Sequence, residues 1–141
     1  MNRARASGGW SEEAREAERE IEREHGASRR LAAYGTLQPG APNHHLVADL
    51  GGSWLQGRVR GRLRHEGWGV LHGYPALEVD PRADEVSVVV LVSDRLPAAW
   101  KRLDRFEGPG YLRVLVPVVL ADGAVRVANL YAARGPGAHA L

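Results

Sequence analysis

From Leu31 onward, short segments rich in β-branched residues follow one another, and most are separated by turns that contain glycine or proline. Segments of this length and composition are typical of β-strands. Six read as strands: RLAAYG, SWLQGRVRGRLRH, PALEV, EVSVVVLV, YLRVLVPVVL and AVRVANLYA, the last two joined by ADG as a hairpin. HHLVADL and the stretch ending in LDRFE read as helical. Many short strands with one or two inserted helices predict an α+β fold, built on a small barrel or a strongly curved sheet.

The first 28 residues have a different character. The segment SEEAREAEREIEREHG (Ser11–Gly26) predicts a charged helix with a serine at its start and a glycine at its end. Its apolar face is thin, so the helix offers little for packing. We therefore expect a charged helical extension over residues 1–28 and a folded domain over residues 29–141. The extension is either a solvated appendage, which we favour, or a helix through which a homo-oligomer forms.

The composition excludes several classes of protein. The chain has no cysteine, and therefore no disulfide, thiol nucleophile or thiolate metal site. Its longest apolar runs, such as VSVVVLV, are too short to cross a bilayer, and the first twenty residues do not resemble a signal peptide. We expect a soluble cytoplasmic protein without a membrane partner.

Basic residues are abundant but do not indicate a nucleic-acid partner. Eighteen of the nineteen basic residues are arginine, and they are spread along the whole chain, which points to composition bias. In one predicted strand every second residue is arginine, so four side chains share a face: Arg58, Arg60, Arg62 and Arg64. This arginine ladder could bind phosphates. A solvated outer face with Val59 and Leu63 inside is the simpler interpretation, because no aromatic residues alternate with the arginines.

Metal and nucleotide sites are not predicted either. The chain has six histidines, but His44 and His45 are adjacent and point apart, and no HExxH-like spacing occurs. GWGVLHG resembles a dinucleotide fingerprint, but its third glycine is one position late and no helix follows it. We expect no metal and no phosphate-binding loop.

A carboxylate ends the apolar stripe of the predicted helix before GPGY. Leu96, Trp100 and Leu103 precede Glu107 by eleven, seven and four positions, the repeat of one helix face. Burial and the negative end of the helix would both raise the pKa of Glu107, as a general base that later returns its proton requires. The alternative is that the stripe continues through Phe106 and leaves Glu107 in solvent.

A second candidate is YGTLQPG, where the first predicted strand ends in a turn. Successive backbone N–H groups at such a turn can bind a carboxylate or an oxyanion without a charged side chain. Gly35 would let the main chain approach a ligand closely. Most turns of this kind only connect two elements, so the segment is a weak signal by itself.

Together, YGTLQPGAPNHHL and LDRFEGPGYLR resemble the gamma-glutamylcyclotransferase-like family, in particular the gamma-glutamylamine cyclotransferase and avirulence-induced-gene-like branch. GYPALEV and ANLYA extend the resemblance over roughly residues 30–134. It implies a small mixed β-barrel with flanking helices. It also implies an enzyme that cleaves a γ-glutamyl amide, in which the substrate's α-amine attacks its own γ-carbonyl and releases 5-oxoproline and an amine or amino acid.

The resemblance assigns roles to six residues. Glu107 matches the catalytic glutamate, and five residues match substrate-binding positions: Tyr34, Gly35, Thr36, Leu37 and Tyr111. The implied partner is a small-molecule γ-glutamyl substrate, with no cofactor and no metal. Intramolecular attack needs a base for the α-ammonium and donors for the oxyanion, and Glu107 and the YGTL turn can supply them.

One departure leaves other functions open. In SVVVLVSDRL, Val90 or Leu91 stands where the family usually has glycine, in a strand expected to line the cavity. The chain could therefore remove a γ-glutamyl group from a dedicated natural-product intermediate. Two further alternatives are a non-catalytic module that binds a small carboxylate and nucleic-acid binding through the arginine ladder.

Overall fold

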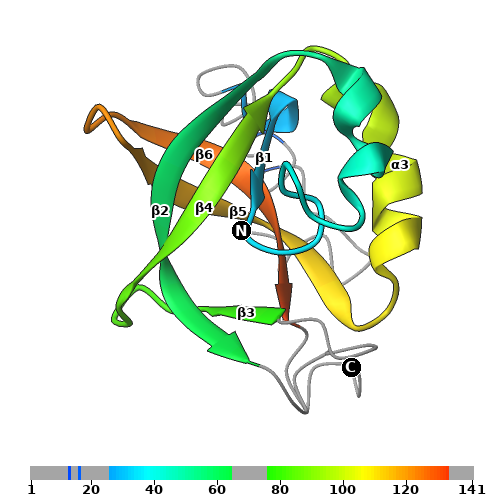
Figure 1. Cartoon of the computed structure of the whole chain (residues 1–141). Coiled ribbons are helices and arrows are strands. Elements are labelled where there is room, and N and C mark those ends of the chain that lie inside the picture. Colours follow the sequence, from blue (N-terminus) through cyan, green and yellow to red (C-terminus); the bar gives the residue numbers. More distant parts are fainter. Residues whose placement is uncertain (1–12, 14–15, 17–25, 65–75, 134–141) are drawn as a thin grey trace.

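In a computed structural model of the chain, which describes residues 26–64 and 76–133 together with Glu13 and Glu16, the strands wrap into a barrel with helical elements on one side (Figure 1). The elements, in chain order, are η1 (Ala27–Arg29), β1 (Arg30–Ala33), η2 (His44–Leu46), η3 (Ala48–Leu50), β2 (Ser53–Arg64), β3 (Ala76–Val79), β4 (Glu85–Val92), α3 (Leu96–Glu107), β5 (Tyr111–Leu120) and β6 (Val125–Ala133). The predicted strands and the helical character of HHLVADL are therefore confirmed. The predicted N-terminal helix lies almost entirely outside the described residues.

Five strands close the barrel. β1 pairs with β4, β4 with β2, and β5 with β6, all antiparallel. β2 meets β5 at Gly57 and Leu120, and β6 returns to β1 through a parallel pairing of Leu31 with Asn129. Because antiparallel and parallel pairs occur in one ring, the barrel is mixed, which confirms this part of the prediction.

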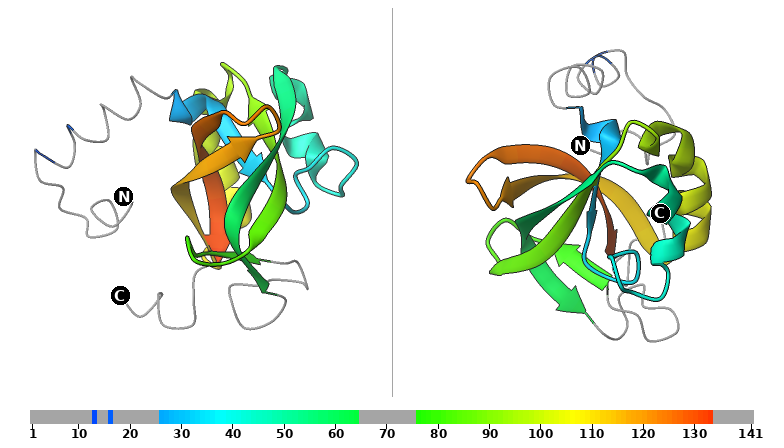
Figure 2. Two further views of the ribbon diagram at one scale, coloured as in Figure 1. Left: turned by 90° about the vertical axis from the view of Figure 1, so that its left-hand side faces the viewer. Right: turned by 45° about the horizontal axis from the view of Figure 1, so that its top comes forward.

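β3 extends the barrel beyond the end of β1. It pairs with β2 through Gly61 and Val79 and with β6 through Leu77 and Ala132. β1, which lies between β4 and β6, is only four residues long, and past Ala33 the place beside β6 is taken by β3. The views in Figure 2 show β3 at the end of the barrel away from η1. The turn that follows β1 is consequently placed next to β3 and β6.

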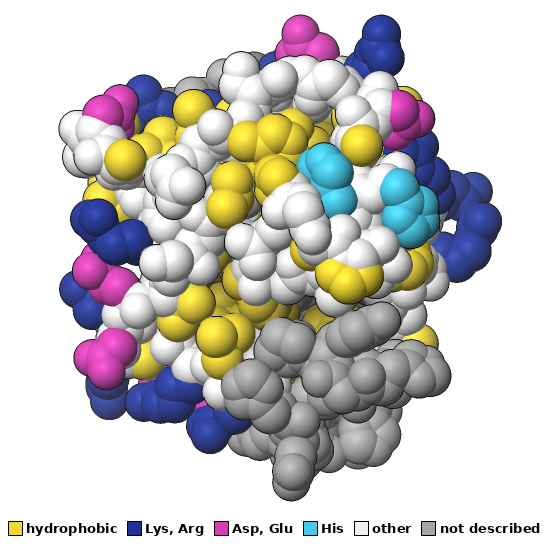
Figure 3. All heavy atoms as spheres, viewed as in Figure 1, with side chains coloured by type: hydrophobic (Ala, Val, Ile, Leu, Met, Phe, Trp, Pro, Cys, Tyr) yellow, Lys and Arg dark blue, Asp and Glu magenta, His cyan; other side chains and the backbone are white. Residues whose placement is uncertain are grey.

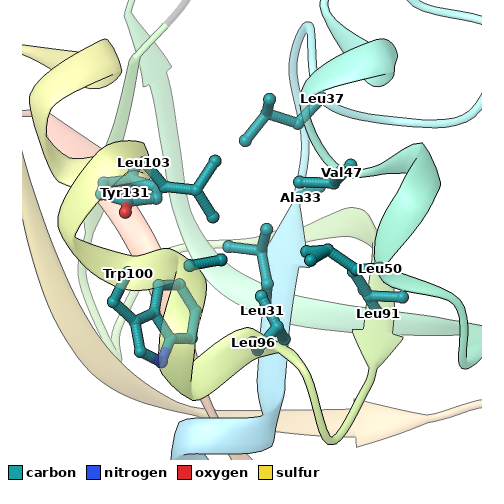
Figure 4. Close-up of a cluster of buried hydrophobic side chains, with 11 residues drawn as sticks. Leu31, Ala33, Leu37, Val47, Leu50, Leu91, Leu96, Trp100, Leu103 and Tyr131 are labelled. Atoms are coloured by element: carbon teal, nitrogen blue, oxygen red, sulfur yellow. The ribbon is translucent and has the colours of Figure 1, made fainter.

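Two hydrophobic clusters stabilise this arrangement. Residues of β1 alternate between them, since Ala32 belongs to the cluster inside the barrel and Leu31 and Ala33 to a cluster beneath α3. The second cluster joins α3, the η2–η3 region and the outer face of the barrel (Figure 4). α3 thus packs directly on the outer face of the barrel. The burial of its apolar stripe fixes the position of its last turn.

The arginine ladder lies on the outside of the barrel. Arg58 bonds to Glu85, Arg62 to Asp80 and Arg64 to Glu78, while Arg60 donates to the carbonyl of Ala83. Acidic and basic side chains accordingly stand side by side along the left edge of Figure 3. Exposed pairs of this kind contribute little to stability.

The burial of the residues of β2 that were expected to face the inside of the barrel differs in part from the prediction. Val59 is buried as expected, but Leu63 is 41% exposed, so its predicted place inside the barrel is wrong. Leu63 lies in the part of β2 that pairs with β3, beyond the residues of β2 that face the barrel core. Within the described residues no helix is long and apolar enough to cross a membrane.

Barrel closure requires a glycine at position 57, and this can be tested. A Cβ built on Gly57 would lie 2.7 Å from Cγ1 of Val118 and 3.3 Å from the carbonyl oxygen of Val119. We predict that Gly57→Ala lowers the free energy of unfolding by about 1–3 kcal/mol, measured by urea denaturation. In a Val118→Ala background, which removes the nearest obstacle, the same change should cost less than about 1 kcal/mol. Equal costs in both backgrounds would contradict this account of closure.

Candidate active site

Glu107 is the last residue of α3 and lies on the buried face of the helix. Leu96, Trp100 and Leu103 of the same stripe are buried, whereas Phe106 is 43% exposed. The alternative stripe through Phe106 is therefore wrong. The chain ends the helix directly after Glu107, at Gly108, whose φ of 77° few other residues adopt.

The half-buried carboxylate of Glu107 is electrostatically unusual. Burial, with a smaller contribution from the nearby charge of Asp104, raises the pKa of Glu107 from its ordinary value of 4.5 to about 7. The direction agrees with the expectation from sequence. Among the described residues, Glu107 has no hydrogen-bond or ion-pair partner. Its carboxylate is therefore available for a ligand and has a proton affinity suited to exchange near neutral pH.

Three tyrosines from different parts of the barrel lie near this carboxylate. Burial raises the pKa of Tyr34, of Tyr111 and of Tyr131, and in each case the negative charge of Glu107 adds to the effect. Such coupling requires proximity. The end of α3 thus meets the turn after β1, the start of β5 and the end of β6. The structure brings Glu107, Tyr34 and Tyr111 into one region, as the sequence resemblance implies.

The hydroxyl of Tyr34 has a structural task. It donates to the carbonyl of Tyr131 in β6 (2.5 Å) and accepts from the backbone N–H of Leu77 in β3 (2.9 Å). It thereby connects two strands next to the point where Leu77 pairs with Ala132. A substrate-binding role of Tyr34, which stays a prediction, would depend on its ring rather than on its hydroxyl.

The turn after Tyr34 has its carbonyl groups occupied. Gln38 donates to the carbonyl of Gly35 from its backbone N–H and its side-chain amide, both at 3.2 Å. The carbonyls of Thr36 and Leu37 accept from the backbone N–H of Asn43 (2.9 Å) and from Nδ1 of His44 (2.9 Å). Asn43 also donates its side-chain amide to the Thr36 hydroxyl (3.0 Å).

The backbone N–H groups of the same turn are in the opposite situation. Those of Gly35, Thr36 and Leu37 donate no hydrogen bond to any other described residue. A Cβ added to Gly35 would meet nothing within 4 Å, so the main chain borders open space there. Free N–H donors beside open space form the kind of main-chain surface that accepts a carboxylate or an oxyanion.

The side chain of Leu37 anchors this turn to the helix. It is only 5% exposed and belongs to the cluster that contains Leu103 of α3 (Figure 4). The turn and the helix end are therefore held together by apolar packing. Any contact of Leu37 with a ligand would come from its backbone, and its predicted binding role is compatible with the structure only in that form.

The structure adds Asp104, Arg113 and Tyr131, to which the sequence analysis assigned no role. The Tyr131 hydroxyl donates to Asp104 Oδ1 (2.6 Å), and Arg113 donates to the same carboxylate from Nε (2.8 Å) and Nη2 (3.2 Å). Asp104 and Arg113 both belong to the LDRFEGPGYLR motif. An acidic and a basic residue nine positions apart were the signal in the sequence that could have indicated an ion pair. The motif thus contains the ion pair that joins α3 to β5.

Two earlier expectations concern groups away from this site. Val90 and Leu91, the departure from the family pattern, are fully buried in the two hydrophobic clusters. Their side chains therefore serve core packing. In the described part of the chain, no group of three or more histidine, aspartate or glutamate side chains is arranged to hold a metal ion.

The burial of Glu107 predicts a pH-dependent stability. Its pKa is higher in the folded state, about 7, than the ordinary 4.5 of an unfolded chain, so the unfolded state binds fewer protons between these values and stability falls as the pH rises through them. We predict that Glu107→Gln is neutral below pH ~4.5 and raises the free energy of unfolding by up to about 3 kcal/mol above pH ~7.

Chemical denaturation at several pH values measures this difference. The exposed Glu85→Gln variant is the control and should change stability by less than about 1 kcal/mol throughout. A Glu107→Gln effect that does not grow with pH would show that the carboxylate is solvated.

The bridge made by Tyr34 gives a second prediction. Tyr34→Phe removes the partner of one backbone carbonyl and one backbone N–H, and should lower the free energy of unfolding by about 1–2 kcal/mol. Urea denaturation provides the measurement. An unchanged midpoint would show that the hydroxyl does not connect β3 and β6.

Comparison with known proteins identifies the family to which the chain is similar. Residues 31–140 match the family described as gamma-glutamyl cyclotransferase, AIG2-like. No curated protein sequence matches the chain.

Solved structures with the same fold include YkqA from Bacillus subtilis, which is 27% identical with a TM-score of 0.59 over 76% of this chain and 36% of its own length. An AIG2-like protein from Mus musculus is 23% identical (TM-score 0.57, 74% of this chain and 76% of its own). An uncharacterised protein from Pyrococcus horikoshii is 25% identical (TM-score 0.51, 74% and 76%). Because the family match covers residues 31–140 of a 141-residue chain, the protein belongs to the AIG2-like gamma-glutamyl cyclotransferase family.

Proposed function

We propose that this protein cleaves a γ-glutamyl amide by intramolecular cyclisation and releases 5-oxoproline and an amine or amino acid. The observation that carries the proposal is the carboxylate of Glu107, which has no partner among the described residues, has a pKa of about 7 and lies next to Tyr34, the residue before the free N–H groups. Family membership supports the reaction class. The substrate class and the role of each residue are the proposal.

In the first step Glu107 acts as a base. The α-ammonium group of the substrate transfers a proton to the carboxylate, and the resulting amine attacks the γ-carbonyl carbon. A carbon–nitrogen bond forms, and the carbonyl oxygen becomes an oxyanion. A carboxylate of ordinary pKa would be a much weaker base near neutral pH, so the buried position of Glu107 suits this step.

The N–H groups of Gly35, Thr36 and Leu37 are the proposed oxyanion donors. The carbonyls of Gly35 and Thr36 are bonded within the turn, and they share peptide planes with the N–H groups of Thr36 and Leu37, so the orientation of these two donors is fixed. Donors held in advance stabilise developing charge without reorganisation, and removal of one such donor typically costs about 10²–10³ in rate. Backbone donors also explain why no charged side chain is needed for this task.

In the last step Glu107 acts as an acid. The tetrahedral intermediate collapses, the bond to the leaving nitrogen breaks, and the protonated Glu107 returns its proton to that nitrogen. The ring nitrogen then loses its second proton, and the released amine takes it up to leave as an ammonium ion. Ring closure thus ends with 5-oxoproline and the protonated amine, and atoms and charge balance without a further reactant. Because attack is intramolecular, holding the glutamyl group in its cyclising shape contributes much of the rate.

A panel of γ-glutamyl amino acids and γ-glutamyl amines tests the proposal, with 5-oxoproline measured as product. We expect turnover by the wild type, with kcat/KM rising as the pH passes about 7, because the base form of Glu107 exists above its pKa. Glu107→Gln should lower kcat by at least about 10²-fold, and Glu85→Gln should have no effect.

The outcomes separate the remaining candidates. Turnover of a single bulky γ-glutamyl amide would identify a dedicated substrate such as a natural-product intermediate. Tight binding of small carboxylates without any product would identify a binding module of the same fold. Equal product from wild type and Glu107→Gln would overturn the catalytic assignment.

A further inference from the structure

Asp104 lies three residues before Glu107, and therefore on the same side of α3, one turn earlier. Its carboxylate receives three hydrogen bonds from two strands. Tyr131 of β6 donates one to Oδ1 at 2.6 Å, and Arg113 of β5 donates one to each oxygen at 2.8 and 3.2 Å. Asp104 is exposed, but its carboxylate is held on both oxygens.

Arg113 is itself held by further contacts. Its Nη1 donates to the side-chain oxygen of Asn129 (2.9 Å), and its guanidinium carbon lies 4.6 Å from the centre of the Trp100 ring. Asn129 in turn donates to the carbonyl of Ala27 (2.8 Å). The rings of Trp100 and Tyr131, both labelled in Figure 4, meet edge to face with 6.5 Å between their centres. The arginine cannot leave Asp104 without breaking these contacts.

The described groups with a charge or a titratable proton that face Glu107 come from every element packed around it. They are Asp104 of α3, Tyr34 after β1, Tyr111 of β5 and Tyr131 of β6, with Arg113 of β5 behind Asp104. Asp104 is the only carboxylate among them. A like charge nearby disfavours the ionised form of a carboxyl group.

We propose that Asp104 is a positioning residue of this site: Arg113 and Tyr131 hold its negative charge one helical turn before Glu107, where it acts on the Glu107 carboxyl group. The inference rests on the proposed function, because a group that takes a proton from an ammonium and later gives one to an amine works best when both forms are populated near neutral pH. The raised pKa of Glu107, caused first by burial and then by Asp104, supports it.

A purely structural role would leave the proton affinity of Glu107 unchanged. The ion pair also fastens α3 to the β5–β6 hairpin, so loss of activity in an Asp104 variant would not distinguish the two roles. The decisive variant is Asp104→Asn, which keeps the shape and an acceptor oxygen for Tyr131 and Arg113 but removes the charge.

The measurement is the side-chain carboxyl ¹³C NMR titration of the full-length protein, with the Glu107 resonance assigned by its absence in Glu107→Gln. We expect a wild-type midpoint of about 7 and a midpoint in Asp104→Asn that is lower by roughly one pH unit, because the nearby negative charge that opposes ionisation of Glu107 is then absent. Asp94→Asn is the matched control. This change also removes one negative charge, but Asp94 lies just before α3, about 20 Å from Glu107 along the helix axis. It should therefore leave the Glu107 midpoint unchanged.

A Glu107 midpoint in folded Asp104→Asn equal to that of the wild type would overturn the proposal. If Asp104→Asn does not fold, Tyr131→Phe decides: losing one donor to Asp104 should raise the midpoint by a few tenths of a pH unit, and no change would again overturn the proposal.

The titration does not depend on turnover, so the two proposals can fail separately. A lowered midpoint without any product in the substrate panel would support the role of Asp104 and count against the reaction. With an active substrate, the acidic limb of the kcat/KM profile should move to lower pH in Asp104→Asn by the same amount as the NMR midpoint. A limb that stays in place while the NMR midpoint moves would show that Glu107 is not the group that limits the rate.

Discussion

The apolar stripe of α3 packs on the outer face of the barrel, and the candidate site depends on this contact. Leu96 and Leu103 are almost completely buried in the cluster that also contains Leu31 of β1 and Leu37 of the following turn. One set of apolar contacts therefore fixes three things together: the helix, the strand and the turn. The site has two parts, a carboxylate at the end of α3 and backbone donors in the turn, and neither would have a defined partner without this packing.

The short first strand explains why the turn is open to a ligand. β1 ends at Ala33, and from there β3 rather than β1 lies next to β6. The chain after β1 must leave the barrel at this point, and the Tyr34 hydroxyl replaces the missing backbone pairing by contacting both neighbouring strands. The backbone N–H groups of the next three residues are released from the sheet, and at a sheet edge such groups are normally paired or solvated.

Sequence reasoning recovered the fold well, because alternation and turn residues report directly on strands. EVSVVVLV and YLRVLVPVVL coincide with β4 and β5. It failed at Leu63, since alternation identifies a face of a strand but not where the core ends along it. It found Glu107 through helical periodicity, but it missed the tasks of Asp104, Arg113 and the Tyr34 hydroxyl. The hydrogen bonds of these groups join residues that are 9 to 97 positions apart in the sequence, and no local pattern encodes such contacts.

The energetics of Glu107 argue for a function rather than a structural role. A partly buried carboxylate at the C-terminal end of a helix is opposed by desolvation, by the helix dipole and here by Asp104. A glutamine would fit the same volume without this cost, which reaches about 3 kcal/mol at neutral pH and above. Natural domains have only about 5–15 kcal/mol of net stability, so the cost is a large fraction of the total. The rest of the structure tolerates it because the apolar stripe of α3 and the Asp104–Arg113 pair hold the helix end in place without any contribution from Glu107 itself.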